Sequence, residues 1–203
     1  KDSTGRIDLR HFYLKRAFRL YPGLVLMCAL LVVFGFHWTR IWPTLGQWSN
    51  FSRVAGADLG VLTHTWFIAV MAHFYLLWPL AIRAIPRRRR IQVIGGLLAL
   101  LLVWRAVAIV VLEPAWVYNA TDTNAAALLA GALLGVTRPR MWAHTGWAIP
   151  LMLGLTFVPF FGEGSPAFLW GGFLAIAFGV VAVGHATADP KWLGASSMVW
   201  LAE

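Results

Sequence analysis

Residues 86–112 read PRRRRIQVIGGLLALLLVWRAVAIVVL, four arginines followed by an apolar run whose one charged residue is Arg105. A helix needs about 20 apolar residues to cross the hydrocarbon core of a bilayer, and residues 91–112 supply them. An arginine run beside an apolar span is typical of an anchor among lipid headgroups. The stretch therefore predicts a membrane-spanning helix whose first end is held at the membrane surface.

The same apolar pattern recurs along the chain. Hydrophobic residues make up 60% of the 203 residues and charged residues 12%, which is more apolar surface than a soluble core could hide. The other apolar runs are residues 20–36, 65–85, 124–136, 146–161 and 168–184, and one more starts near Trp192. We therefore expect an all-α, polytopic transmembrane bundle with about six spans. Because the chain starts at Lys1 and stops at Glu203 in mid-pattern, we expect a piece of a longer protein, truncated at both ends.

The basic residues fall on one side of this bundle. Of the 17 lysines and arginines, 14 lie in residues 1–19, 83–90, 138–140 and 185–195. The alternate connections contain four acids, Asp58, Glu113, Asp122 and Glu163. The positive-inside rule places the basic set in the cytoplasm. Membrane topology thus accounts for the net charge of +9, and we expect no nucleic-acid partner.

A few small residues carry structural expectations. Cys28 is the only cysteine and lies in an apolar run, so we expect a buried side chain and no disulfide within these residues. Gly131 and Gly135 form a small-xxx-small pair, which is typical of two closely packed helices. The sequence has no metal-binding motif, and we expect neither a metal ion nor a bound cofactor.

Arg16 and Arg19 are the first candidates for ligand binding. They are three residues apart and therefore share one face of a helix at the cytoplasmic mouth of the first span. Arginine side chains match the geometry of phosphate groups, so a phosphorylated cytoplasmic donor such as a coenzyme A thioester would fit. The alternative is that both residues only anchor the helix in the headgroup region.

Other polar residues lie within or beside the spans. Arg105 is about eight residues, or about 12 Å, from the outer end of its span, so it either faces an acid such as Asp122 or snorkels to the interface. His73 could act as a general base, because imidazole titrates near neutral pH, or it could be hydrogen-bonded within the bundle. His64, at the outer mouth of its span, is either interfacial or functional.

Three stretches resemble the signature of the acyltransferase-3 family. Residues 5–22, GRIDLRHFYLKRAFRLYP, are similar to the aromatic pair, Arg-x-x-Arg and proline of that family. Residues 64–79, HTWFIAVMAHFYLLWP, resemble its His-Thr-Trp motif and Leu-Trp-Pro ending. Residues 118–123, YNATDT, precede LLAG at 128–131 as in the family. The three motifs occur in the family's order.

The resemblance implies a multi-pass protein of a bacterial inner membrane with roughly ten helices, of which residues 1–203 form one partial domain. It implies transfer of an acyl group, such as acetyl, from cytoplasmic acyl-CoA to a hydroxyl of an envelope glycan or another small acceptor. Acyl-CoA is then a co-substrate bound by Arg16 and Arg19. The motif match at residues 64–79 favours a functional role for His64. The family's catalytic histidine lies upstream of these residues, so residues 1–203 alone are not expected to transfer acyl groups.

The chain departs from the family pattern at several positions. Met71 and Ala72 occupy positions where the family commonly has an acid and its neighbour, and His73 replaces a glutamine. Phe67 replaces a serine, and Asn124 stands where an arginine is common. A methionine cannot transfer a proton. A catalytically inactive or structural membrane protein is therefore the main alternative, and a transporter is less favoured because no internal repeat is visible.

Overall fold

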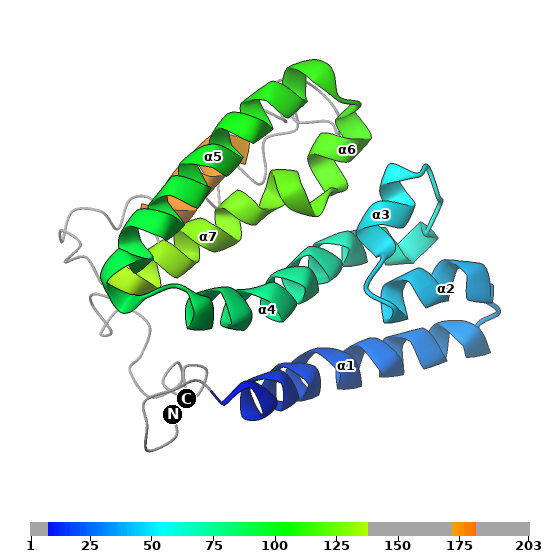
Figure 1. Cartoon of the computed structure of the whole chain (residues 1–203). Coiled ribbons are helices and arrows are strands. Elements are labelled where there is room, and N and C mark those ends of the chain that lie inside the picture. Colours follow the sequence, from blue (N-terminus) through cyan, green and yellow to red (C-terminus); the bar gives the residue numbers. More distant parts are fainter. Residues whose placement is uncertain (1–7, 138–171, 182–203) are drawn as a thin grey trace.

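A computed structural model describes residues 8–137 and 172–181. The elements are α1 (Leu9–Val33), α2 (Trp38–Leu45), α3 (Ser49–Val54), η1 (Gly60–Thr65), α4 (Trp66–Ala84), η2 (Arg87–Arg89), α5 (Arg90–Val111), α6 (Pro114–Asn119) and α7 (Thr121–Thr137). A further apolar helix covers Gly172–Val181. All the elements in these two ranges are helical, which confirms the predicted all-α class (Figure 1).

Three of these helical segments are long and apolar enough to cross a membrane: Leu9–Val33, Gly60–Ala84 and Arg87–Val111. They correspond to the first three predicted spans. The predicted fourth span lies within α7, which begins earlier than expected and has 17 residues. The helix Gly172–Val181 lies within the predicted span 168–184. The expected spans at residues 146–161 and beyond Trp192 lie outside the described residues.

Local chemistry explains where these helices start and stop. The Asp8 side chain accepts a hydrogen bond from the backbone nitrogen of His11 at 3.1 Å, which caps the start of α1. Helix α4 stops at Ala84 because Ile85 precedes Pro86 and adopts an extended backbone. Pro114 occupies the first turn of α6, where its missing N–H costs nothing. The spans are thus separated at positions that the sequence marks.

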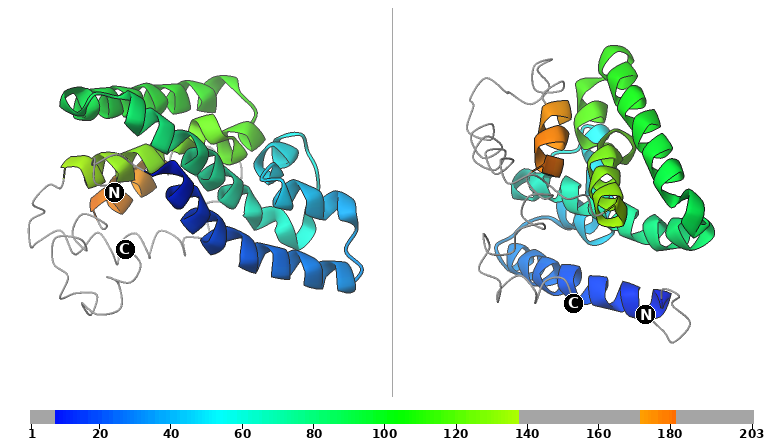
Figure 2. Two further views of the ribbon diagram at one scale, coloured as in Figure 1. Left: turned by 60° about the horizontal axis from the view of Figure 1, so that its bottom comes forward. Right: turned by 90° about the vertical axis from the view of Figure 1, so that its left-hand side faces the viewer.

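Helices α5 and α7 lie side by side and form the main core of the bundle (Figures 1 and 2). Ile94 of α5 and Leu129 of α7 pack with Ile82 of α4, and apolar side chains of all three helices surround them. Helix α1 lies against α4, and the Tyr13 hydroxyl of α1 donates to the Leu76 carbonyl oxygen of α4 at 2.8 Å. The core therefore forms from residues that are distant in sequence.

The segment between α1 and α4 differs from the sequence interpretation, which treated residues 37–60 as an outer connection. Helices α2 and α3 and the turn η1 instead fold back against the bundle (Figure 2). Ile41, Leu59 and Leu62 pack around Cys28 of α1, and all four side chains are buried. Burial of this apolar cluster favours the folded-back arrangement over a solvated loop.

The outward faces of the long helices are apolar and exposed. Phe18 of α1 is 75% exposed and Val110 of α5 is 77% exposed. Contiguous apolar surface of this extent is stable in contact with lipid rather than with water. The glycine pair of α7 behaves differently from expectation: a Cβ added at Gly131 or Gly135 meets no atom within 4 Å among the described residues. The predicted close helix packing at these glycines was wrong for the described part of the fold.

Charged segments gather at opposite ends of the bundle. The arginines of η2 lie at the end where α4 passes into α5, and the start of α1 and the end of α7 lie toward the same end (Figure 1). The connection that contains Asp58, and Glu113 before α6, lie at the other end. This separation has the arrangement that the positive-inside rule predicts for a multi-pass protein.

Candidate functional site

A cavity of about 490 Å³ lies between α1, the turn that joins α2 to α3, and α4. We call it the inner cavity. Its polar and aromatic wall includes Tyr13, Arg16, Gln47, Trp48, His73 and Tyr75. Small-molecule sites typically have volumes of about 300–1,000 Å³, so the inner cavity is large enough for part of a substrate. Arg16 and His73, which the sequence indicated as candidate site residues, both line this cavity.

Arg16 is held at the wall of the inner cavity by aromatic rings. Its guanidinium carbon lies 4.6 Å from the ring centroid of Tyr75 and 5.5 Å from that of Phe12. A guanidinium stacked on a ring keeps its N–H donors in the plane, where they can bind a phosphate or carboxylate. Arg19, the second predicted donor-binding residue, is exposed on α1 and is not among the residues that line the cavity. The structure therefore separates the predicted pair.

His73 lies about two turns into α4 and is part of a partly buried chain of polar groups. Its Nδ1 atom is 2.8 Å from the hydroxyl oxygen of Thr121, the first residue of α7. The Nδ2 amide of Asn50, in α3, donates to the same hydroxyl at 3.0 Å. The backbone of Gln47 also forms a hydrogen bond with the imidazole. The Thr121 hydroxyl can thus donate to Nδ1 while it accepts from Asn50.

The turn between α2 and α3 has unusual local structure. Gln47 has a φ of 60°, in the left-handed region that non-glycine residues rarely adopt. The side chains of Gln47, Ser49 and Asn50 are buried, yet Gln47 Nε2, Ser49 Oγ and Asn50 Oδ1 have no hydrogen-bond partner in the described part of the chain. Backbone strain and unsatisfied polar atoms are features that concentrate at functional sites. The turn therefore belongs to the candidate site.

Aromatic rings enclose this chain of polar groups. The rings of Trp48 and Phe51 lie 5.8 and 5.7 Å, centroid to centroid, from the imidazole of His73. The Phe51 ring is stacked on the imidazole and the Trp48 ring is tilted against it, while the imidazole forms its hydrogen bonds with Thr121 and Gln47. In apolar surroundings each such hydrogen bond is stronger than in water. His73 is therefore rigidly placed beside the inner cavity.

Arg105 and Asp122 fix the start of α7, where Thr121 lies. Arg105 is 5% exposed, and its guanidinium donates to the Thr123 carbonyl oxygen at 3.0 Å and to Asn124 Oδ1 at 3.3 Å. The Asp122 carboxylate accepts from the indole nitrogens of Trp104 at 2.8 Å and Trp116 at 3.2 Å. The guanidinium is thus held by neutral oxygen atoms of α7, and the carboxylate links α5, α6 and α7.

The remaining candidates lie apart from the inner cavity or contribute no polar group to it. His64 is exposed in η1, whereas the neighbouring Thr65 is buried and hydrogen bonds Thr44 at 2.9 Å. Met71 is half-buried in α4, and Ala72 lines the cavity. Residues 71 and 72 therefore present no ionisable group where the family commonly has an acid.

Sequence reasoning did not single out Thr121, Asn50 or Gln47. Thr121 lies inside the quoted motif at residues 118–123, so the resemblance marked its neighbourhood but not its role. Asn50 and Gln47 lie in a segment interpreted as an outer connection, and nothing in the spacing of residues 37–60 indicated that it folds back to His73. Only the packing of α2 and α3 against α1 and α4 brings these side chains together.

Apolar spanning helices with polar groups gathered inside the bundle define an integral membrane protein with an internal site. Residues 2–202 match the acyltransferase domain of the acyltransferase-3 family. The chain belongs to this family, as the motifs in residues 5–22, 64–79 and 118–123 predicted.

A curated relative is similar to nearly the whole of this chain. The chain is similar to the peptidoglycan O-acetyltransferase OatA of Listeria monocytogenes, with 25% identity over 95% of this chain and 37% of the relative. The chain thus spans little more than a third of that protein's length. No solved structure matches the chain.

Proposed function

We propose that the protein is a membrane-bound acyltransferase, located in a bacterial inner membrane. It takes an acyl group from acyl-CoA at the cytoplasmic face and transfers it to a hydroxyl of an envelope glycan. Membership of the acyltransferase-3 family supports the reaction class, and the similarity to a peptidoglycan O-acetyltransferase supports a glycan acceptor. One observation carries the proposal beyond the family: a single cavity is lined both by Arg16 and by His73.

In this proposal the acyl-CoA donor binds at the end of the inner cavity that is lined by Arg16. Arg16 lies near the start of α1, at the basic end of the bundle, where a cytoplasmic polyphosphate would arrive. Its stacked guanidinium offers a planar set of donors to a phosphate of coenzyme A. The acyl chain would then extend along the apolar cavity wall toward His73. Electrostatic attraction and apolar burial thus act on the two ends of one substrate.

In the proposed reaction the acceptor hydroxyl oxygen attacks the thioester carbon, the carbon–sulfur bond breaks, and coenzyme A leaves as a thiol that takes up one proton. The acceptor hydroxyl loses one proton in the same process. His73 has an imidazole beside the cavity and is this chain's own candidate to receive that proton. The family's catalytic histidine is the other candidate.

Substitution of Arg16 in the full-length protein tests the donor site. Arg16→Ala should raise the Kd for acyl-CoA about tenfold or more, since a hydrogen bond to a charged group is worth about 1.5–3 kcal/mol and about 1.4 kcal/mol is tenfold. Arg10→Ala is a matched control on the same helix, because Arg10 is exposed and does not line the cavity. Arg19→Ala should have a smaller effect than Arg16→Ala. Equal Kd values for the wild type and Arg16→Ala would reduce Arg16 to an anchor.

The alternative function is that of an inactive or structural membrane protein. The observation that favours it is the lack of an ionisable group at Met71 and Ala72. Purified full-length protein should decide between the two, by transfer of radiolabelled acetyl from acetyl-CoA to glycan fragments. Binding of acyl-CoA without any transfer would support the alternative. Transfer that is reduced by His73→Ala would contradict it.

A further inference from the structure

The turn that ends α2 has a side chain at a position where helices usually have a glycine. The backbone nitrogen of Trp48 donates to the Pro43 carbonyl oxygen at 2.7 Å, and that of Gln47 donates to the Thr44 carbonyl oxygen at 3.2 Å. These two hydrogen bonds form a Schellman motif, with Gln47 at the residue after the C-cap. That residue needs a positive φ, here 60°, which glycine adopts without strain and glutamine does not.

The glutamine side chain gains no hydrogen bond at Nε2 in return. Gln47 is 7% exposed, and its Nε2 atom is buried without a partner in the described residues. A buried donor without an acceptor is destabilising, as is the strained backbone. A glycine at position 47 would remove both costs and keep both backbone hydrogen bonds. Strained residues of this kind concentrate at active sites and ligand clamps, so we looked for a role of the amide toward a ligand.

Gln47 lies in the wall of the inner cavity. The same wall contains Arg16 and His73, and the Gln47 backbone hydrogen bonds the His73 imidazole. The terminal torsion of a glutamine is soft, so the amide can turn and present an N–H to a group bound in the cavity. Leu20 and Trp48 make the adjoining wall apolar. A hydrogen bond formed in such surroundings is stronger than one in water.

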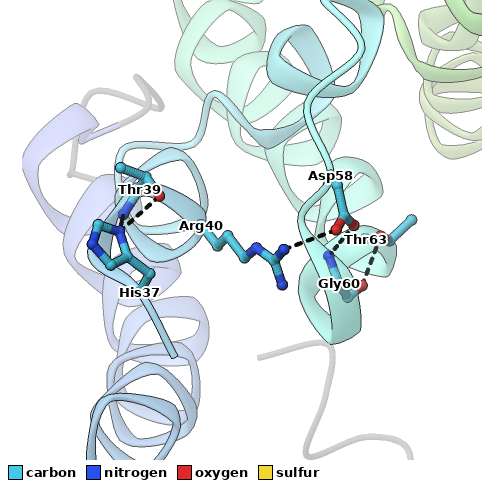
Figure 3. Close-up of polar contacts among 6 residues, drawn as sticks. All are labelled: His37, Thr39, Arg40, Asp58, Gly60 and Thr63. Carbon is cyan, nitrogen blue, oxygen red and sulfur yellow. Dashed lines mark hydrogen bonds and ion pairs between the residues drawn. The ribbon is translucent and has the colours of Figure 1, made fainter. Parts of the chain in front are cut away.

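The segment that carries Gln47 is held in place from both ends of α2. At the start of α2, Arg40 forms an ion pair with Asp58 at 3.0 Å, and Asp58 also accepts from the backbone nitrogen of Gly60 at 2.8 Å (Figure 3). Further along α2, Ile41 is buried against Cys28 of α1. A donor on an anchored segment needs little reorganisation when charge develops beside it, which is the property of an oxyanion hole.

On the basis of the acyltransferase function proposed above, we infer that the Gln47 amide donates a hydrogen bond to the carbonyl oxygen of the thioester. When the acceptor hydroxyl oxygen attacks the thioester carbon, an electron pair of the carbonyl bond moves onto that oxygen, and the hydroxyl proton leaves to a base. The amide stabilises the resulting negative charge. The carbonyl bond then re-forms as the carbon–sulfur bond breaks, and the departing thiolate takes up a proton. Gln47 itself neither gains nor loses a proton.

Gln47→Gly in the full-length protein separates this catalytic role from a structural one. Its kcat for acetyl transfer should fall about 100-fold or more, the usual effect of removing one oxyanion donor, while the KM for acetyl-CoA changes little. Its thermal unfolding temperature in a mild detergent should equal or exceed that of the wild type, because glycine suits the Schellman position. A structural glutamine predicts the opposite, a loss of stability together with the loss of activity.

Two Gln→Glu variants form a matched pair. Gln47→Glu keeps the shape of the side chain but replaces the N–H donor with an acceptor, so its kcat should fall at least as far as that of Gln47→Gly. Gln92→Glu makes the same change on the exposed surface of α5, away from the cavity wall, and should keep the wild-type kcat. Wild-type kcat in Gln47→Gly, or a Gln47→Gly protein that is both slower and less stable, would overturn the inference.

Infrared spectroscopy tests the contact without turnover. Acetyl-CoA with a ¹³C-labelled thioester carbonyl should show a lower carbonyl stretching frequency when bound to the wild type or Gln92→Glu than when bound to Gln47→Gly, because a hydrogen bond weakens the carbonyl bond. Equal frequencies in the wild type and Gln47→Gly would overturn the inference. If the wild type shows the lowered frequency but transfers no acetyl group to any glycan, the Gln47 contact stands and the acyltransferase proposal fails.

Discussion

At the scale of single residues, Thr121 connects the parts of the candidate site. Its hydroxyl lies 2.8 Å from His73 Nδ1 and 3.0 Å from Asn50 Nδ2, so it joins α4, α3 and α7. Loss of this hydroxyl would leave two partly buried polar atoms with one partner fewer. Leaving a buried donor or acceptor unsatisfied costs about 1–3 kcal/mol.

Thr121→Val should therefore lower kcat for acyl transfer about tenfold or more while the KM for acyl-CoA changes little, because valine keeps the shape of threonine without its hydroxyl. The measurement is steady-state kinetics of the full-length protein. Thr121→Ser retains the hydroxyl and should keep most of the wild-type kcat. If Thr121→Ser and Thr121→Val are equally slow, the methyl packing and not the hydroxyl is what matters.

Arg105 is the residue whose burial the sequence predicted most directly. The sequence predicted that Arg105 either faces an acid or snorkels to the interface, and the structure provides the neutral oxygen atoms of Thr123 and Asn124. Arg105→Leu should destabilise the protein by about 1.5–3 kcal/mol, since hydrogen bonds to a charged group are lost and the Thr123 carbonyl loses that donor. Thermal unfolding in a mild detergent measures this. A stability equal to or above that of the wild type would mean that the guanidinium is held only weakly.

At the scale of elements, the helix Gly172–Val181 is docked against α5 through Arg105. A Cβ at Gly172 would collide with the Arg105 guanidinium, which also lies 5.8 Å from the ring centroid of Phe173. Because hydrogen bonds to α7 hold that guanidinium, it cannot move aside freely. The small residue at position 172 is therefore required for contact between the two helices.

Gly172→Ala and Gly131→Ala form a matched pair that tests this docking. Gly172→Ala should lower the thermal stability in detergent, because the added methyl group meets Arg105. Gly131→Ala should leave stability unchanged or raise it by up to about 1 kcal/mol, because alanine favours a helix and no atom of the described residues lies within 4 Å of a Cβ at that position. The reverse order of stabilities would restore the small-xxx-small interpretation of α7 and contradict the docking of Gly172.

At the scale of the whole molecule, the separation of charge between the two ends of the bundle predicts its orientation in the membrane. Cysteine labelling of intact cells tests it, with Arg88→Cys and Glu113→Cys as the two reporters. The residue at 113 should label from outside and the residue at 88 only after the membrane is permeabilised. The native Cys28 is 2% exposed and should label from neither side. Labelling of both reporters from the same side would refute the predicted topology.

The sequence by itself determined the helical class, the spans of α1, α4 and α5, and the family. The helical class and the spans depend on the length and composition of apolar runs, which decide whether a helix is stable in a bilayer. The family depends on the order of the motifs along the sequence. It also indicated His73 and Arg105, because polar groups within apolar spans are costly and therefore conspicuous. Arg16 was indicated by its spacing from Arg19, and Asp122 as a candidate acid partner of Arg105.

Only the tertiary structure decided what these residues contact. Nothing in the connection at residues 37–60 showed that Gln47 and Asn50 would lie beside His73, because that proximity depends on α2 and α3 packing against α1 and α4. The same packing kept Arg16 in the inner cavity and left Arg19 exposed, although both share a basic motif. Spacing along one helix shows which residues share a face. Which other helix packs against that face depends on long-range contacts, through the burial of apolar surface and the hydrogen bonding of buried polar groups.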